Sequence, residues 1–234
     1  MNRRIAIARP QSGVPCTQSG VAPTFASEPA CNARRRLLLL ASLLALPVAR
    51  AAIDLVATPA QMLGPFYPLQ PDSRAGNDLA RGERGRAQGA PLTLVGAVRD
   101  TAGRALPGVL VEIWQTNAHG RYHHPHDDSP QPLDPNFQGY GRATTDAEGA
   151  YRFATIAPVA YPGRTPHVHF RLSRGGRELL VTQMYLPEAA AANERDGLYR
   201  SVGDAAARRR LLGVAVPGAS GTLRFDIVLA AARD

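Results

Sequence analysis

Six short runs of β-branched and aromatic residues, separated by turn residues, restrict this chain most strongly to one class of fold. Turn-forming sequences such as 100–103 (Asp-Thr-Ala-Gly) and 146–149 (Asp-Ala-Glu-Gly) lie between the runs. Short strands at such spacing are typical of β-sandwiches. We therefore predict an all-β fold, an antiparallel β-sandwich with long loops and little helix. The predicted strands cover residues 92–98, 109–114, 151–155, 167–172, 179–185 and 223–229.

The rest of the sequence contains little helical pattern. One helix is predicted over residues 204–212 with Asp204 as its N-cap, and a short helical turn over residues 188–193. The region before the first strand is rich in Pro, Gly and Arg and has little periodicity, which indicates an extended arm. We therefore predict an N-terminal arm over residues 52–90, followed by a β-sandwich domain over residues 91–234.

Residues 1–51 have the layout of an export signal with an upstream extension. They contain seven Arg and one acidic residue, an apolar run at 37–48 and the sequence Ala-Arg-Ala at 49–51. The apolar run is too short to span a bilayer. The arginines at 34–36 resemble a twin-arginine signal, and a Sec signal is the alternative. We expect an exported protein, periplasmic or secreted, without stable membrane insertion once the signal is removed.

Removal of this segment changes what the composition implies. The whole chain has a formal net charge of +8, but residues 52–234 carry 20 Arg against 18 acidic residues. This nearly neutral remainder has no basic stripe with interleaved aromatic residues, so no nucleic-acid partner is expected. Cys16 and Cys31 both lie in the removed segment. Disulfides, thiolate metal sites and cysteine nucleophiles are therefore excluded from the mature protein.

A dense group of candidate metal ligands lies within residues 161–170. Side chains alternate between the two faces of a strand, so His167 and His169 are predicted to point to the same side. Pro166 suits the border of a strand, which places Tyr161 on the loop before it. A His-x-His pair alone is more often structural or exposed than metal-binding, so its neighbours must decide.

A second histidine-rich segment competes for the same role. Residues 114–141 form a long polar stretch, and long loops inside compact domains are usually functional. It contains His123, His124, His126 and Asp127, more ligand-type side chains than any other stretch. Adjacent loop histidines are equally typical of a solvated surface, and we favour the His167 and His169 pair.

Six motifs follow one another along the chain: Gly-Arg-Tyr at 120–122, Leu-Asp-Pro-Asn-Phe at 133–137, Thr-Asp-x-x-Gly-x-Tyr-x-Phe at 145–153, Tyr-Pro at 161–162, Pro-His-Val-His-Phe at 166–170 and Arg-Phe-Asp-Ile-Val-Leu at 224–229. In this order they resemble the intradiol ring-cleaving dioxygenases, and most closely the iron-bearing (beta) subunits of protocatechuate 3,4-dioxygenases. The resemblance covers about residues 64–229. It implies a non-haem Fe(III) cofactor held by two tyrosinates and two histidines, which by motif are Tyr122, Tyr161, His167 and His169.

The chemistry of these residue types agrees with a ferric ion. Fe(III) is a hard cation that suits oxygen and imidazole donors. The pKa of free tyrosine is about 10, but a bound trivalent ion can keep a phenol deprotonated. A ferrous site would be expected to use two histidines and a carboxylate. The acidic residues nearest His167 in the sequence form no such motif.

The resemblance also implies a reaction and further roles. The enzyme would be an oxidoreductase that uses O2 to cleave a catechol-type ring, protocatechuate or a catechol derivative, to a cis,cis-muconate-type diacid. Tyr161 would leave the metal and take up a proton, and Arg164 would stabilise negative charge on the ring. Gln183 would lie behind the ligands, or else be a solvent-facing strand residue. Gly64 and Pro65 would line the aromatic pocket.

Substrate and partners are less constrained. Gly163 stands where the family leads us to expect a tryptophan, and the connection from Tyr161 to His167 is short, so the width of the pocket is open. The resemblance implies a homo-oligomer or a related second subunit. Two other functions remain as alternatives: a non-catalytic β-sandwich module of the transthyretin or carboxypeptidase-regulatory type, and a zinc-binding protein that uses the histidine-rich loop.

Overall fold

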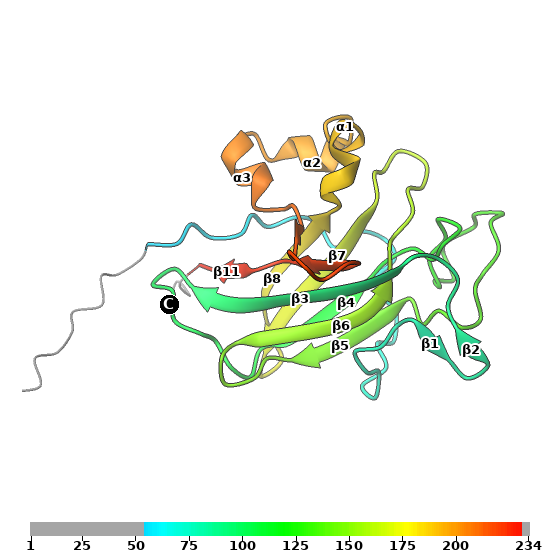
Figure 1. The fold of residues 1–234 in the computed structure, drawn as a ribbon, viewed down its shortest axis with the longest axis horizontal. Helices are drawn as coiled ribbons and strands as arrows, with labels where there is room; N and C mark the ends of the chain where they lie inside the picture. Colours follow the sequence, from blue (N-terminus) through cyan, green and yellow to red (C-terminus); the bar gives the residue numbers. More distant parts are fainter. Residues whose placement is uncertain (1–53, 231–234) are drawn as a thin grey trace, which may run out of the picture. The chain divides into compact units, whose positions relative to one another are not determined.

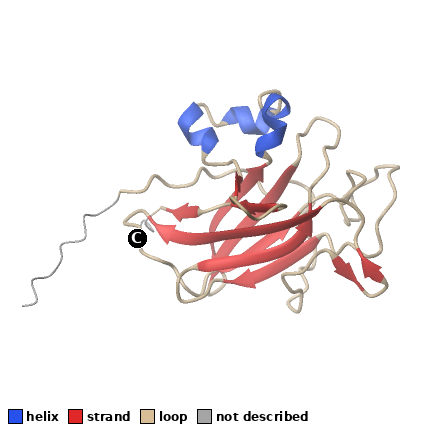
Figure 2. Ribbon diagram, in the orientation of Figure 1, coloured by secondary structure: helices blue, strands red, loops and turns tan. Residues whose placement is uncertain are grey.

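Two β-sheets pack face to face in the computed structural model, which describes residues 54–230 (Figures 1 and 2). The predicted export signal, residues 1–51, lies outside the described residues. One sheet contains β3 (Pro91–Asp100), β6 (Ala150–Ile156), β9 (Val214–Ala215), β10 (Thr222–Arg224) and β11 (Ile227–Leu229). The other has the order β5 (Tyr140–Thr144), β4 (Leu110–Trp114), β7 (His167–Arg174), β8 (Arg177–Tyr185). The predicted all-β sandwich is confirmed.

Most of the strand pairs are antiparallel, with one difference at the C-terminal end. The predicted strand 223–229 is divided into β10 and β11, and both pair with β3 in parallel. The division lies at Phe225 and Asp226, where the Asp226 carboxylate accepts a hydrogen bond from the Ala97 backbone N–H at 2.9 Å. A Cβ at Gly96 would lie 2.0 Å from the Phe225 carbonyl oxygen, so the close approach of these segments requires glycine.

The two-residue periodicity of β7 and β4 determines which side chains enter the core. Val168 and Phe170 point between the sheets and join the main apolar core. His167 and His169 lie on the opposite face of β7 but are also buried. They are covered because a second apolar cluster lies on that face, made of Trp114, Tyr122 and Tyr140 with Leu63, Phe66, Tyr67, Ala75 and Tyr161. This outer face of the sheet, the platform face, is therefore shielded from solvent by the second apolar cluster.

The predicted extended arm runs along the edges of the sheets. Backbone N–H groups of Leu55, Thr58 and Gln61 donate to the carbonyl oxygens of Thr101, Val228 and Val181. Further along, the Gly76 carbonyl accepts from Arg142 N–H, and Leu79 N–H donates to the Ala154 carbonyl. A two-residue hairpin, β1 (Arg81–Gly82) and β2 (Gly85–Arg86), completes the segment. The arm is thus hydrogen-bonded to strands of both sheets.

Short helices gather at one side of the sandwich (Figure 2). They are η1 (Pro187–Ala189), α1 (Ala190–Asn193), α2 (Gly197–Ser201) and α3 (Ala205–Arg209). Asp204 caps α3, as predicted, by accepting from Ala206 N–H and Ala207 N–H. The helix α2 was not predicted, and its N-cap is Asp196. None of the helices between residues 54 and 230 is long and apolar enough to cross a membrane.

Candidate metal centre

Three donor atoms converge on the platform face of β7. The hydroxyl oxygen of Tyr122 lies 3.1 Å from His169 Nε2 and 3.3 Å from His167 Nε2. The two Nε2 atoms are 3.1 Å apart. Tyr122 comes from the loop after β4, so residues far apart in the sequence meet here, and all three side chains are buried.

The orientation of His167 is fixed by a backbone carbonyl. Its Nδ1 lies 2.6 Å from the carbonyl oxygen of Thr165, which can only accept a hydrogen bond. The ring proton of the neutral imidazole is therefore on Nδ1, and Nε2 presents a lone pair to Tyr122 and His169. This is the arrangement of a metal-ligating histidine held by a hydrogen bond from its other nitrogen.

His169 is held by packing. Its imidazole stacks on the indole of Trp114, with ring centroids 4.7 Å apart and an angle of 10° between the planes. Gly64 lies against the same imidazole, because a Cβ at this position would be 3.2 Å from His169 Cε1. The buried Nδ1 of His169 has no hydrogen-bond partner among the described residues. Gly64 thus contacts a candidate ligand, whereas the sequence predicted that it lines the substrate pocket.

Tyr161 lies beside this convergence on a tight turn. Arg164 N–H donates to the Tyr161 carbonyl at 2.9 Å, and Gly163 in the turn has a φ of +80°. The phenol ring of Tyr161 is half-buried, with its centroid 5.6 Å from that of Tyr122 and 5.7 Å from that of His167. Arg164 Nη1 donates to the Tyr161 hydroxyl at 3.4 Å. All four predicted ligands are therefore neighbours, and Tyr161 is the most exposed of them.

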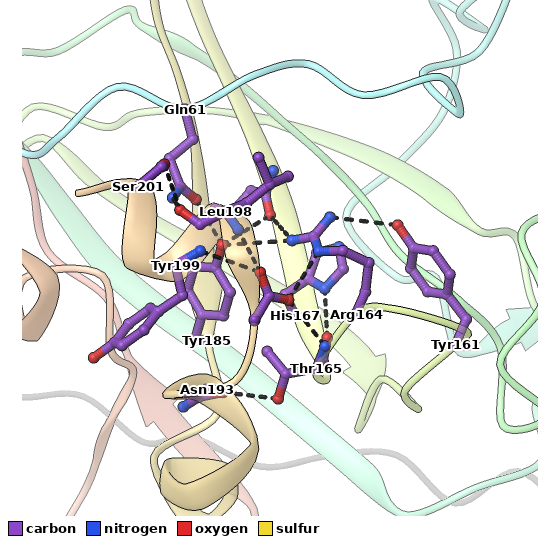
Figure 3. A network of polar contacts seen from close by, with 12 residues as sticks. Gln61, Tyr161, Arg164, Thr165, His167, Tyr185, Asn193, Leu198, Tyr199 and Ser201 are labelled. Atoms are coloured by element: carbon purple, nitrogen blue, oxygen red, sulfur yellow. Dashed lines mark hydrogen bonds and ion pairs between the residues drawn. The ribbon is translucent and has the colours of Figure 1, made fainter. Parts of the chain in front are cut away.

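Arg164 belongs to a polar network that also contains Tyr161 and Tyr185 (Figure 3). Gln183 is a further member of this network. Arg164 Nη2 donates to Gln183 Oε1 at 2.5 Å, and Gln183 Nε2 donates to the Met62 carbonyl at 3.2 Å. Gln183 is fully buried, so its alternative as a solvent-facing residue is wrong. The other partner of Arg164 is Asp196, whose Oδ2 accepts from Arg164 Nε at 2.8 Å. Sequence reasoning missed Asp196, because an N-cap of a five-residue helix gives no periodic signal.

Burial determines the protonation of the candidate ligands. Burial lowers the pKa of His167 to about 3 and that of His169 well below its ordinary value, and the positive charge of Arg164 adds to both effects. Both imidazoles are therefore neutral at pH 7, as metal binding requires. Burial also raises the pKa of the Tyr122 phenol well above its ordinary value. A bound cation would reverse this last effect by stabilising the phenolate.

The donor set fits a ferric ion. Metal–nitrogen bonds are about 2.0–2.1 Å long, so donors in adjacent coordination positions lie about 3 Å apart. The separations of 3.1 Å and 3.3 Å among the three donor atoms match that spacing. A cation between them would satisfy three inward-facing lone pairs at once, and two phenols with two imidazoles suit a hard trivalent ion.

The histidine-rich loop is not arranged as a metal site. His123 and His126 are exposed, and the Nδ1 of His124 accepts a hydrogen bond from the His126 backbone N–H at 3.1 Å. Between residues 54 and 230, no three His, Cys, Asp or Glu side chains are grouped so as to hold a metal ion. The zinc alternative is therefore not supported. Asp127 has a different role, since its carboxylate accepts from Tyr122 N–H at 2.7 Å and fixes that backbone.

An open cavity borders the centre. It has a volume of about 370 Å³ and is lined by Phe66, Tyr161, Pro162, Gly120 and residues 127–130. Phe66 stacks on Tyr122 with ring centroids 4.6 Å apart, and it was not predicted as a site residue. Pro65, which was predicted, is exposed and does not line this cavity. The neighbouring Gly64-Pro65 motif was the signal that could have identified Phe66.

Comparisons with known proteins agree with this geometry. A family model described as Dioxygenase matches residues 62–231. The protocatechuate 3,4-dioxygenase beta chain of Burkholderia cepacia is 44% identical over 135 residues, which cover 53% of this chain and 57% of that protein. Hydroxyquinol 1,2-dioxygenase of Nocardioides simplex is 30% identical over 204 residues, which cover 75% of this chain and 66% of that protein.

A solved structure is similar as well. The dioxygenase domain of a dioxygenase carbohydrate-binding protein fusion from Streptomyces sp. SirexAA-E has a TM-score of 0.59 and 33% identity, and the match covers 76% of this chain and 100% of that one. The chain spans about half to two-thirds of the length of the curated relatives that it matches. The region matched by the family model, residues 62–231, includes both sheets and all four candidate ligands. The alternative of a non-catalytic sandwich module is therefore not supported. The chain therefore belongs to the intradiol ring-cleaving dioxygenase family.

Proposed function

We propose that the protein is a non-haem Fe(III) intradiol dioxygenase that cleaves a catechol-type ring with O2. The observation that supports this most strongly is the convergence of the Tyr122 hydroxyl, His167 Nε2 and His169 Nε2 within 3.3 Å of one another. A β-sandwich does not need this arrangement for its stability, because the single phenol proton can pair with only one of the two buried imidazoles, and an unpaired buried imidazole nitrogen costs free energy unless a cation lies between the donors.

Tyr122, Tyr161, His167 and His169 would hold the iron in this proposal. A ferric ion bound there would supply the Lewis acidity that activates a chelated catechol toward O2. Thr165 and Trp114 support His167 and His169 through a hydrogen bond and through stacking. The two fixed histidines thus differ from Tyr161, which lies on a turn and is half-buried.

Tyr161 is the ligand suited to be displaced when substrate binds. As a phenolate, the Tyr161 oxygen would accept one proton released by the diol, and Arg164 Nη1, 3.4 Å from that oxygen, would stay in place. Burial raises the pKa of the Tyr161 phenol, and Arg164 partly offsets this rise. Arg164 is fixed by Asp196 and Gln183, so its charge is preorganised to stabilise negative charge that develops on the substrate.

The substrate class is an aromatic diol, protocatechuate or another catechol derivative, and the second substrate is O2. The product would be a cis,cis-muconate-type diacid. The similarity to a protocatechuate 3,4-dioxygenase beta chain supports protocatechuate, and the similarity to a hydroxyquinol 1,2-dioxygenase supports other diols. The first of these relatives is a beta chain, which also supports a related second subunit beside this chain. A homo-oligomer is the alternative.

The direct test is an oxygen-uptake screen with product identification. Purified protein loaded with ferric iron is mixed with catechol, protocatechuate, hydroxyquinol and substituted catechols, and products are identified by mass. We expect stoichiometric iron, a visible tyrosinate-to-iron absorption band, and uptake of one O2 per ring cleaved between its hydroxyl-bearing carbons. Protein that binds iron without a visible band, or that takes up no O2 with any diol, would contradict the proposal.

We also propose that the protein is exported. The support is the arginine-rich segment followed by the apolar run at 37–48 and Ala-Arg-Ala at 49–51. The intact mass of protein recovered from outside the cytoplasm is expected to match that of a chain that begins at Ala52. Recovery of the full-length chain only, in the cytoplasm, would contradict export.

A further inference from the structure

We propose that Asp196 is the positioning residue of this centre, because it holds both the arginine beside Tyr161 and the loop that orients His167. The inference rests on the proposed function, since it concerns the same iron site. Asp196 lies outside the sandwich, at the start of α2, and no motif of the sequence identified it.

The carboxylate of Asp196 accepts four hydrogen bonds that link two segments. Its Oδ1 accepts from the backbone N–H groups of Leu198 and Tyr199 at 2.9 Å and 3.1 Å. Its Oδ2 accepts from Arg164 Nε at 2.8 Å and from Thr165 N–H at 3.0 Å. One oxygen therefore caps the helix, and the other holds the loop before β7.

Two routes lead from this carboxylate to the candidate ligands, one through Arg164 and one through Thr165. Through Arg164, it fixes the guanidinium that donates to the Tyr161 hydroxyl at 3.4 Å. Through the Thr165 N–H, it holds the backbone of the residue whose carbonyl oxygen accepts from His167 Nδ1 at 2.6 Å. A displaceable ligand and a fixed ligand are therefore both positioned by one side chain.

A neutral side chain could not replace this carboxylate. The Asp196 side chain is 0% exposed and that of Arg164 only 13%, so the charge of the guanidinium is compensated almost entirely inside the protein. Without iron, the other side-chain acceptors of Arg164 among residues 54–230 are neutral, namely Gln183 Oε1 and the hydroxyls of Tyr161 and Tyr185. Removal of one partner leaves the other charge buried, and the guanidinium would shift toward water.

The test separates this role from helix capping. Asp196→Ser retains an N-cap hydroxyl but cannot also reach Arg164 and Thr165. Asp196→Asn retains the size of the side chain and removes its charge. Asp204→Ser is the matched control, because Asp204 also caps a five-residue helix, by accepting from Ala206 N–H and Ala207 N–H, and does not contact the centre.

All proteins are loaded with ferric iron, and the visible band, iron content, kcat and KM are measured together with Tm. For both Asp196 variants we expect a shifted band and a kcat lowered by about 10- to 100-fold, with a much smaller change in KM. Asp204→Ser is expected to lower Tm alone. If Asp196→Ser matches Asp204→Ser in band position and kcat, the positioning role is wrong. If an Asp196 variant does not fold, the other variant decides.

A failure of the proposed function looks different, because the wild-type protein itself would then show neither the band nor O2 uptake. The two ideas are therefore tested separately by the same set of samples.

Discussion

The indole of Trp114 lies flat against the imidazole of His169, with their centroids 4.7 Å apart. The same imidazole meets Gly64 on the arm, and its Nδ1 has no hydrogen-bond partner within residues 54–230. His167, by contrast, is oriented by the Thr165 carbonyl. The two candidate ligands on one strand are therefore held by different forces, and substitutions should affect them separately.

Gly64→Ala should weaken iron binding by about 10- to 100-fold, a typical loss when a group that orients a ligand is removed. A Cβ here would lie 3.2 Å from His169 Cε1, and the φ of +77° adds backbone strain. The control is Gly218→Ala, with a φ of +76° and, apart from its two chain neighbours, no atom of residues 54–230 within 4 Å of the new Cβ. Competition with an iron chelator measures both affinities. Equal losses of iron affinity in the two variants would mean that backbone strain alone causes the effect.

Tyr161→Phe should bleach or shift the visible band of the iron-loaded protein and slow turnover. The protein should remain folded, because the Tyr161 side chain is half-buried and the hydrogen bond that its hydroxyl accepts from Arg164 is long, at 3.4 Å. Tyr199→Phe is the control, since this phenol packs against Tyr185, away from the four candidate ligands. Absorption spectra and steady-state rates of both variants decide the matter, and an unchanged spectrum in Tyr161→Phe would remove Tyr161 from the ligand set.

His124→Ala should leave the visible band, the iron content and the turnover unchanged. The Nδ1 of His124 is already occupied by the His126 backbone N–H, and His124 is not among the groups that meet at Tyr122. His169→Ala is the comparison and should lose iron. Metal analysis after gel filtration measures both variants. Loss of iron from His124→Ala would return the histidine-rich loop to consideration as the metal site.

Glu112→Gln should destabilise the fold by about 1–3 kcal/mol, the cost of leaving buried donors poorly paired. The Glu112 side chain is 4% exposed and accepts from the hydroxyls of Tyr67 and Tyr140 and from Arg171 Nη1. Glu178→Gln is the control, because Glu178 binds the same arginine with a side chain that is 50% exposed, and it should cost about 0–1 kcal/mol. Urea unfolding of the iron-free proteins measures the difference.

The acid stability of the iron-free protein should depend on Asp196. Burial alone would raise the pKa of this carboxyl, but hydrogen bonds from Thr165 N–H and Arg164 hold it below its ordinary value of 3.8. The unfolded chain then binds the proton more readily than the native protein does. Its contribution to stability is therefore complete above about pH 4 and is lost as the pH falls through the lower native pKa. The difference in unfolding free energy between wild type and Asp196→Asn should shrink over that range.

The sequence predicted the sandwich well because its information is local. Alternation along β7 placed Val168 and Phe170 in the core and the two histidines on one face, and all six predicted strands are present. The strand β5 was missed because Gly141 interrupts its pattern. A Cβ at Gly141 would lie 2.4 Å from Leu79 Cδ1, so this glycine is required by an arm residue that is distant in the sequence.

The candidate ligands could be identified from motifs, but their supports could not. Three supporting residues act through contacts between segments far apart in the sequence, namely Trp114, Phe66 and Asp196. Their neighbours in the sequence indicate only an ordinary strand, arm or turn residue. Asp127 was read as one member of a histidine-rich cluster, whereas its carboxylate is used by the Tyr122 backbone. Tertiary contacts therefore determine which polar residues serve the centre.

The hydrogen bonds between the arm and the strands have a consequence for solubility. Unpaired strand edges are templates for association between chains. Leu79 N–H and Gln61 N–H cover positions on β6 and β8, and the Gly76 carbonyl covers one on β5. Without the arm, β-strands at the margins of both sheets would be open to other copies of the protein. The segment that carries Gly64 and Phe66 to the candidate metal centre therefore also protects the sandwich against aggregation.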